Sequence, residues 1–188
     1  NKIKKKAKLI TSIAMFYDLE DPIKFAKDVH TALDKNGIWH LELSYMPSML
    51  KNISYDTICH EHLEYYSLTS IKYILDKAKF KIIDIEFNEI NGGSFALSVA
   101  KKNSRYKEEG KIVSWLLAKE KLLKVNERKT FIDFFKKCQK QKKILRNLLI
   151  NLKSAGKKVF GYGASTKGNV ILQFCGIDSK LIKFVGEV

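Results

Sequence analysis

The chain has 188 residues, which is enough for one ordinary domain or for parts of two. Apolar residues make up 45% of it, so the composition excludes disorder over the whole length. No apolar run approaches the ~18 residues of a membrane span and no charged-then-apolar leader opens the chain, so neither a membrane nor export is expected. Cys59, Cys138 and Cys175 lie far apart without a CxxC pair, which favours a reducing cytoplasm over a disulfide framework or a zinc site.

The net charge of +15 suggests an anionic partner, but its distribution argues against binding to nucleic acid. Residues 121–158 hold 13 Lys and Arg against 2 Asp and Glu. Apolar residues of the same segment follow helical spacing and predict a buried stripe with the lysines on the opposite face. The stripe consists of Phe131, Phe134, Phe135, Cys138, Leu145, Leu148, Leu149 and Leu152. A solvated basic face is the favoured interpretation, and attraction of an anionic ligand or surface is the alternative.

Hydrophobic periodicity and turn signals define the expected elements. In chain order they are strand 6–13, helix 21–33, strand 38–44, helix 67–80, strands 80–90 and 94–102, helices 106–124 and 127–155, strand and turn 157–164, helix 166–176 and strand 181–187. Asp21-Pro22 starts the first helix, and the Lys-Asn-Gly at 35–37 is a left-handed cap signal that would end it. A loop is expected around Pro47, and Ser67 or Thr69 would cap the next helix.

This order predicts an α/β fold. The first part is the closing half of a doubly wound parallel sheet, and Asn91-Gly92-Gly93 joins its last two strands as an antiparallel hairpin. Two helices follow, and the final strand, helix and strand begin a second parallel α/β unit. The expected division is a partial domain at 1–104, a helical connector at 105–156 and the start of a second domain at 157–188. Both ends of the chain look cut.

The stretch TICHEH, residues 57–62, contains two of the four histidines. On an extended segment His60 and His62 would point to the same side and Glu61 to the other. A metal site is the weakest interpretation, because three or four ligands are needed and no further Cys/His cluster lies nearby in the sequence. A structural polar corner and a proton-transfer site both remain open, since an imidazole titrates near neutral pH.

Four segments carry a family resemblance in their order along the chain: SIAMFYDLEDP, YDTICHEHLEYYSL, NGGSF and GYGASTKGN. The chain resembles the S-adenosylmethionine-dependent C-methyltransferases that branch nucleotide-linked deoxysugars. The resemblance implies the second half of a class I methyltransferase Rossmann-like sheet, followed by helices and a second Rossmann-like domain. It also implies that the family's zinc-binding N-terminal domain and glycine-rich donor loop precede Asn1. The donor site would then lie only partly in this chain, the chain alone would be inactive, and strand 7–13 would expose an edge open to self-association.

The resemblance assigns roles to the HEH segment. His62 would be the general base, Glu61 would orient groups in the site, and His60 would contact the acceptor. Cys59 stands where the family commonly has Tyr. Removal of a C–H proton next to a ketone would give an enolate that attacks the methyl sulfonium, and a nearby donor would stabilise the enolate oxygen. Tyrosine candidates for that donor are Tyr17, Tyr55 and Tyr65.

The resemblance also places ligand contacts elsewhere. Ala14 and Met15 would line the methionine part of S-adenosylmethionine, at the carboxyl edge where open α/β sheets bind ligands. Tyr17 and Asp18 would face the acceptor, although some members carry His in place of Asp18; a plain turn capped by Asp21 is the alternative. The nucleotide-sugar side of the cleft would be contacted by Ser165, Thr166, Lys167 and Asn169. A tight strand-to-helix turn is the alternative for that segment.

The sequence therefore predicts a cytoplasmic S-adenosylmethionine-dependent methyltransferase of deoxysugar biosynthesis that methylates carbon in a nucleotide-linked keto-deoxysugar. Two alternatives remain: the same scaffold acting on another small acceptor or on oxygen, and a non-catalytic basic binding module.

Overall fold

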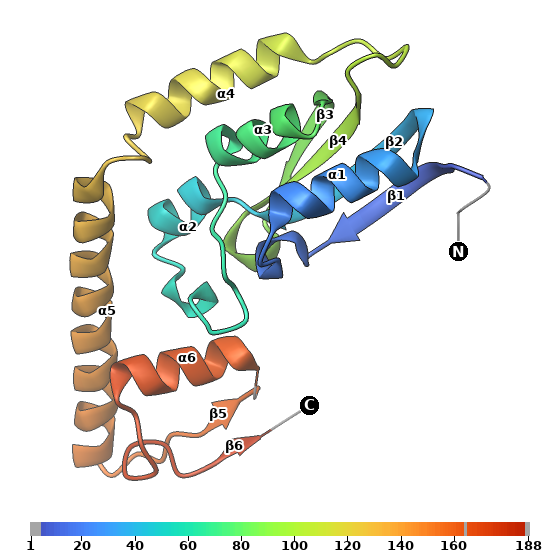
Figure 1. Ribbon diagram of the computed structural model, residues 1–188. Coiled ribbons are helices and arrows are strands. Elements are labelled where there is room, and N and C mark those ends of the chain that lie inside the picture. Colours follow the sequence, from blue (N-terminus) through green and yellow to red (C-terminus); the bar gives the residue numbers. More distant parts are fainter. Residues whose placement is uncertain (1–4, 164, 187–188) are drawn as a thin grey trace. The chain divides into compact units, whose positions relative to one another are not determined.

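The structure, a computed structural model, describes residues 5–163 and 165–186 and contains two compact units. Unit 1 comprises Asn1–Asn52 and Glu61–Asn126, and unit 2 comprises Ile53–His60 and Glu127–Val188. Figure 1 shows the elements of each unit along the chain. The expected division at 104 and 156 stays a prediction, because compactness alone does not define a domain.

Unit 1 is built on a four-stranded sheet in the order β1-β2-β4-β3. The strands are β1 (Ala7–Ile13), β2 (Leu33–Ser44), β3 (Phe80–Asn88) and β4 (Ser94–Lys101). β1 and β2 are parallel, whereas β4 runs antiparallel to both β2 and β3. The predicted half-sheet with a terminal hairpin is thus confirmed. The carboxyl ends of β1, β2 and β3 consequently meet at one edge of the sheet, here called the carboxyl edge.

Helices cover one face of this sheet (Figure 1). They are α1 (Pro22–Ala32), α3 (Leu68–Lys77) and α4 (Gly110–Leu122), and α1 and α4 both contact α3. Alternate residues of β2, among them Trp39, Leu41 and Leu43, point into this layer and are buried. This alternation is the pattern of a strand that is packed on one face. The helices start where the sequence signals predict: Asp21 accepts the Lys24 N–H, and Ser67 caps α3.

Two local predictions in unit 1 are wrong. The helix ends at Ala32 without a left-handed cap, because Leu33 is extended, fully buried and already paired with Ala7 in the sheet. Gly37 instead permits close packing, since a Cβ there would lie 2.8 Å from the Ala7 carbonyl oxygen. The expected loop around Pro47 is helix α2 (Met46–Asn52), whose first turn tolerates proline and whose apolar side chains are buried.

Strand β1 is an edge strand within the part of the chain that the structure describes. It pairs with β2 on one side, and its Leu9 and Ile13 side chains are 61% and 50% exposed. An exposed apolar edge strand is a site where another strand can pair. The exposed edge is as predicted; self-association through it stays a prediction.

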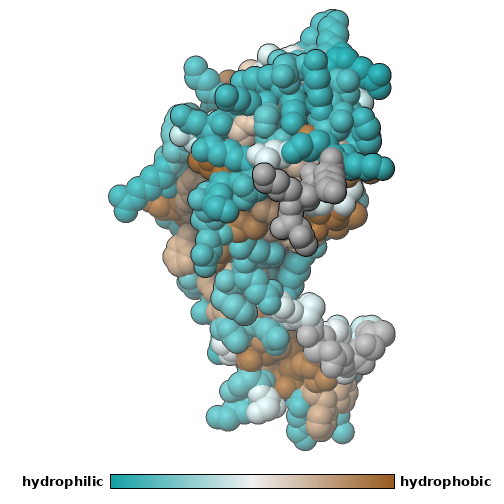
Figure 2. All heavy atoms as spheres, turned by 45° about the vertical axis from the view of Figure 1, so that its right-hand side comes forward, coloured by the Kyte–Doolittle hydropathy of each residue, from teal (hydrophilic) through white to brown (hydrophobic). Residues whose placement is uncertain are grey.

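Unit 2 contains α5 (Arg128–Ser154), α6 (Thr166–Cys175) and a parallel pair of short strands, β5 (Gly161–Tyr162) and β6 (Val185–Gly186). The predicted strand, helix and strand of a second parallel unit are present, with strands of two residues each. Ala164 of the GYGAS turn lies outside the described residues. Figure 2 shows apolar surface on this unit as well as polar surface.

The predicted buried stripe of α5 is only partly correct. Phe134, Cys138 and Leu149 are buried, but Phe131, Phe135 and Leu148 are 41%, 56% and 52% exposed. Within unit 2 the helix packs against α6, which covers only part of the stripe. Helical spacing predicts which residues share a face, but not whether a neighbouring element covers all of it. Among residues 5–163 and 165–186, none of the helices combines the length and apolar composition of a membrane span.

Candidate active site

The loop that follows β1 begins the candidate site at the carboxyl edge of unit 1. Ala14 adopts a left-handed conformation with φ 52°, and its N–H donates to the Glu42 carbonyl at the end of β2 (2.9 Å). The Asp18 N–H donates to the Met15 carbonyl (3.1 Å), which closes a short 3-10 turn over Phe16–Asp18. The loop thus lies at the carboxyl edge, with Ala14 and Asp18 exposed and Met15 half-buried against the core.

Phe16 fixes the position of this loop. Its side chain is fully buried, with ring centroids 5.7 Å from Trp39 and 5.5 Å from Tyr66. A buried aromatic cluster of this kind is packed in one geometry and holds the backbone on either side. The next residue, Tyr17, is therefore held at the edge of the core, where its side chain is 7% exposed.

The structure brings Tyr17 and His62 together. Their ring centroids are 4.4 Å apart with an interplanar angle of 59°. The Tyr17 carbonyl accepts the backbone N–H groups of Leu63 and Glu64 at 3.0 and 3.1 Å. Two backbone bonds and a ring contact therefore hold the half-buried His62 against the loop after β1. The sequence motifs that carry these residues are 45 positions apart, so this juxtaposition could not be read from spacing.

The HEH segment is not extended, so the condition under which His60 and His62 were expected to share one side does not hold. The chain turns at His60 and Glu61. His62 packs against Tyr17 in unit 1, whereas the exposed His60 lines a pocket of unit 2, and Glu61 is exposed. The physical reason is the attachment of the following residues to the Tyr17 carbonyl, which redirects the backbone after the turn.

The hairpin turn between β3 and β4 also lies at the carboxyl edge. Asn91, Gly92 and Gly93 all have positive φ, and the Tyr45 N–H donates to the Gly93 carbonyl (3.0 Å). A Cβ on Gly93 would lie 2.5 Å from Ser48 Cβ, so α2 packs directly on the turn. The predicted hairpin is confirmed, with a 3-10 turn over Ile90–Gly92.

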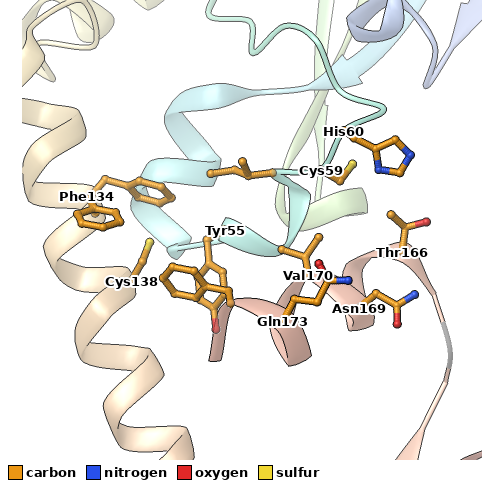
Figure 3. Close-up of a pocket in the computed structure, with 12 residues that line it drawn as sticks. Tyr55, Cys59, His60, Phe134, Cys138, Thr166, Asn169, Val170 and Gln173 are labelled. Carbon is orange, nitrogen blue, oxygen red and sulfur yellow. The ribbon is translucent and has the colours of Figure 1, made fainter. Parts of the chain in front are cut away.

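Unit 2 contains a pocket of about 670 Å³. Figure 3 shows that its labelled side chains come from three segments: 53–60, α5 and α6. His60, Thr166, Asn169 and Gln173 bring polar groups into a wall that is otherwise largely apolar and aromatic. Pockets of this size, mostly apolar with a few polar groups, are typical of small-molecule sites.

Tyr55 belongs to the wall of this pocket. Its ring lies 5.0 Å from the Phe174 ring, and its hydroxyl is 3.5 Å from Cys175 Sγ. Burial, and then the hydrogen bond and electrostatic effect of the Cys175 sulfur, raise the pKa of the Tyr55 hydroxyl well above its ordinary value. Tyr55 therefore stays a neutral phenol at physiological pH. Its hydroxyl and its ring are both engaged by residues of unit 2.

The residues predicted to contact an anion lie at the start of α6, around a helix cap. Ser165 is the N-cap and accepts the Gly168 N–H (3.3 Å), and Gly163 has φ 98°. Thr166 and Asn169 line the pocket, whereas Ser165 and Lys167 do not. The tight strand-to-helix turn is thus present, and binding of an anion there stays a prediction.

Sequence reasoning missed a buried polar cluster behind the site. Glu120 of α4 is fully buried and accepts the Tyr45 hydroxyl at 2.8 Å and the N–H groups of Leu68 and Thr69 at 2.6 and 2.9 Å. Burial, and then the Glu120 carboxylate, raise the pKa of Tyr45 far above its ordinary value. The signal in the sequence was spacing: Glu120 lies four and seven residues after Leu116 and Val113, on the buried stripe of its helix.

Tyr66 is a second buried phenol close to the site. Its side chain is 3% exposed, and among the described residues its hydroxyl has no hydrogen-bond partner. Burial, and then the Glu64 charge, raise its pKa. The described residues also contain no cluster of three or more His, Cys, Asp or Glu arranged to hold a metal ion.

Comparison with known proteins decides the family. Residues 89–188, more than half of the chain, match the model of the C-methyltransferase C-terminal domain, and residues 2–85 match a methyltransferase domain. The chain belongs to the S-adenosylmethionine-dependent C-methyltransferase family. Among the family's proteins, C-methyltransferase NovU from Streptomyces niveus is 29% identical over 181 residues. That match covers 96% of this chain and 43% of NovU, so the chain spans less than half of its relative's length.

Solved structures related to this C-methyltransferase chain are more distant. A putative methyltransferase from Bacillus halodurans is 12% identical with a TM-score of 0.43, covering 53% of this chain and 65% of that one. An S-adenosylmethionine-dependent methyltransferase from Clostridium acetobutylicum is 15% identical with a TM-score of 0.42, covering 54% of this chain and 61% of that one.

Proposed function

We propose that the full-length protein transfers a methyl group from S-adenosylmethionine to a carbon atom of a nucleotide-linked keto-deoxysugar. The observation that carries this proposal is the contact between Tyr17 and His62 at the carboxyl edge, in a chain whose two halves match methyltransferase and C-methyltransferase models. Carbon methylation needs a base, and an imidazole can accept a proton near neutral pH.

Residues of the loop after β1 fit one wall of a methyl-donor site. Ala14 is small and exposed, so a ligand can approach it. Met15 is half-buried against the core and would form the firmer part of the same wall. When bound, S-adenosylmethionine would supply an electrophilic methyl group.

His62 is the proposed general base. Its imidazole would take the proton from the carbon next to the acceptor ketone, and the electron pair of that C–H bond would become the enolate. The carbon of the enolate is then the nucleophile, and the proton stays on His62 until solvent removes it. Tyr17, whose ring touches the His62 ring, would hold the imidazole in place and is the proposed donor toward the acceptor oxygen.

The pocket of unit 2 is the proposed acceptor site. His60, Thr166 and Asn169 line it, and their polar groups suit a sugar or its nucleotide. Ser165 and Lys167 lie at the start of α6, where free N–H groups and a positive charge favour phosphate. Glu61 and Asp18 belong to unit 1, and for them we keep the roles that the resemblance implies: Glu61 would orient groups of the acceptor, and Asp18 would contact it.

The proposal is tested by incubating the full-length protein with S-adenosylmethionine and a panel of nucleotide-linked keto sugars. Mass spectrometry should find one acceptor that gains a single methyl group, and NMR should place that group on carbon. A methyl group on oxygen would support the alternative reaction on the same scaffold. No methylation of any sugar, with salt-dependent binding to nucleic acid of any sequence, would support a binding module instead.

A further inference from the structure

We propose that Glu120 is a positioning residue for His62, an inference that rests on the function proposed above. Glu120 does not touch His62. It lies on α4 and is buried among four donors: the Tyr45 hydroxyl, the Leu68 and Thr69 N–H groups and the Thr69 hydroxyl. All of these groups belong to unit 1.

The chain between His62 and α3 is held at three points. The Tyr17 carbonyl binds the N–H groups of Leu63 and Glu64 at the first point. At the second, the Met46 N–H donates to the Tyr66 carbonyl (2.8 Å), and Tyr45 and Tyr66 form an isolated bridge. Glu120 forms the third point at Leu68 and Thr69, and its bond to Tyr45 ties the third point to the second. The chain that follows His62 is therefore held at three points up to the start of α3.

Helix capping alone does not explain this carboxylate. The start of α3 already has a reciprocal cap, in which Ser67 accepts the Ser70 N–H and Ser70 accepts the Ser67 N–H. Glu120, which lies on another helix 52 residues after Leu68, adds hydrogen bonds to the same helix start, and its charge is buried there. A buried charge with all of its hydrogen bonds made stabilises little compared with an apolar residue, but it strongly disfavours other arrangements of its partners.

The geometry requires a carboxylate. A carboxylate only accepts hydrogen bonds, and its two oxygens can serve all four donors. Glutamine at this position would keep one accepting oxygen and turn an NH₂ group toward the other pair of groups; the hydroxyl of that pair could rotate to accept, but its backbone N–H would lose its partner. Tyr45 and the start of α3 would then shift, and the His62 segment with them. A displacement of about 1 Å at a catalytic group can cost roughly 100-fold in rate.

The test compares Glu120→Gln with Glu109→Gln in the full-length protein. Glu109 is the N-cap of the same helix and accepts the Ile112 N–H, a bond that the amide oxygen of Gln can keep, so this variant reports the effect of removing a glutamate charge from α4. We expect Glu120→Gln to lower kcat about 10- to 100-fold while the KM for S-adenosylmethionine changes less than about threefold. Glu109→Gln should leave both constants near the wild-type values at a temperature where each variant is folded.

A second readout does not depend on activity. The Tyr17 ring contacts the His62 ring at a tilt of 59°, so NMR signals of the His62 ring protons report this contact. Glu120→Gln should move these signals, and Tyr45→Phe, which removes only one of the four donors, should move them less in the same direction. Tyr45→Phe also keeps the test valid if Glu120→Gln does not fold. Unchanged His62 signals in both variants would overturn the positioning role, whether or not the wild-type protein methylates a sugar.

Discussion

Gly93 has a backbone conformation that disfavours any side chain, and the neighbouring Ser48 fills the space that a side chain would need. Its φ is 116°, and a Cβ would lie 2.5 Å from Ser48 Cβ. We expect Gly93→Ala to lower the free energy of unfolding of unit 1 by about 1–3 kcal/mol. Both tryptophans of the chain, Trp39 and Trp115, belong to unit 1, so their fluorescence in a urea titration reports its unfolding.

Gly110→Ala is the matched control for this glycine. Gly110 opens α4 without a positive φ, and nothing lies within 4 Å of a Cβ there. The change should be neutral or stabilise by about 0.4–1 kcal/mol, because alanine has fewer unfolded conformations to lose. Equal effects of the two substitutions would show that the turn at Gly93 does not have the geometry described here.

His30 makes the stability of unit 1 depend on pH. It lies in the last turn of α1 with its ring 5.3 Å from Phe80, and burial, then the charges of Lys101 and Lys79, lower its pKa. His30 therefore binds a proton more readily in the unfolded chain, where its pKa has the ordinary value of about 6.5, than in the folded protein. The stabilisation that neutral His30 contributes to the folded protein is complete above pH 6.5. It is lost as the pH falls from 6.5 through the lower pKa of the folded state.

Replacement of His30 by Gln should remove this dependence. We expect the unfolding free energy of the wild-type protein to fall more between pH 7.5 and pH 5.5 than that of the variant. The ring packing lost in the variant lowers its stability at every pH, so the slopes are compared and not the absolute values. Parallel slopes for the two proteins would contradict the lowered pKa.

At the scale of elements, the long helix α5 carries most of the net charge. Lys136, Lys137 and Lys140 are exposed on it. Replacing all three by Gln should leave methyl transfer within a few-fold, because surface changes away from packing typically cost less than ~0.5 kcal/mol each. Lys142→Gln is the contrasting variant, since Lys142 is half-buried with its Nζ 5.2 Å from the Phe174 ring beside the pocket. A larger loss in the triple variant that shrinks as salt is added would favour attraction of an anionic ligand.

The elements that local signals define were predictable. Alternation along 38–44, the Asp21-Pro22 start of α1 and the glycines after Asn91 each have one strongly favoured structure, and each occurs as expected. The failures came from tertiary packing. Burial of Leu33 begins β2 earlier than the turn signal at 35–37 suggests, and the exposed part of the α5 stripe depends on which element covers it.

In the candidate site, too, local motifs were predictable and tertiary contacts were not. The loop after β1 and the HEH segment were found from their motifs, but only the fold reveals that Tyr17 binds the segment of His62. Glu120 was overlooked because lysines flank it on both sides, although its spacing from Leu116 places it on the buried face. The grouping of 53–60 with α5 and α6 depends on contacts between residues far apart in the chain, which no local pattern encodes.

At the scale of the whole molecule, the two units divide the proposed roles. Unit 1 has the carboxyl edge with Ala14, Tyr17 and His62, and unit 2 has the pocket lined by His60, Thr166 and Asn169. The HEH segment connects them in the chain, because His60 belongs to unit 2 and His62 to unit 1. The central claim of this account is that His62 removes a proton from the acceptor.

Solvent deuterium exchange at the acceptor carbon tests this claim most directly, because exchange requires the same proton removal but no methyl transfer. In the full-length protein with a bound keto sugar, His62→Asn should slow exchange by ~10²–10⁴-fold, the usual scale of a lost general base, while the variant still binds the sugar. His60→Asn should slow exchange less, and Glu61→Gln should be intermediate. Exchange at the wild-type rate in His62→Asn would contradict the account and leave HEH as a structural corner.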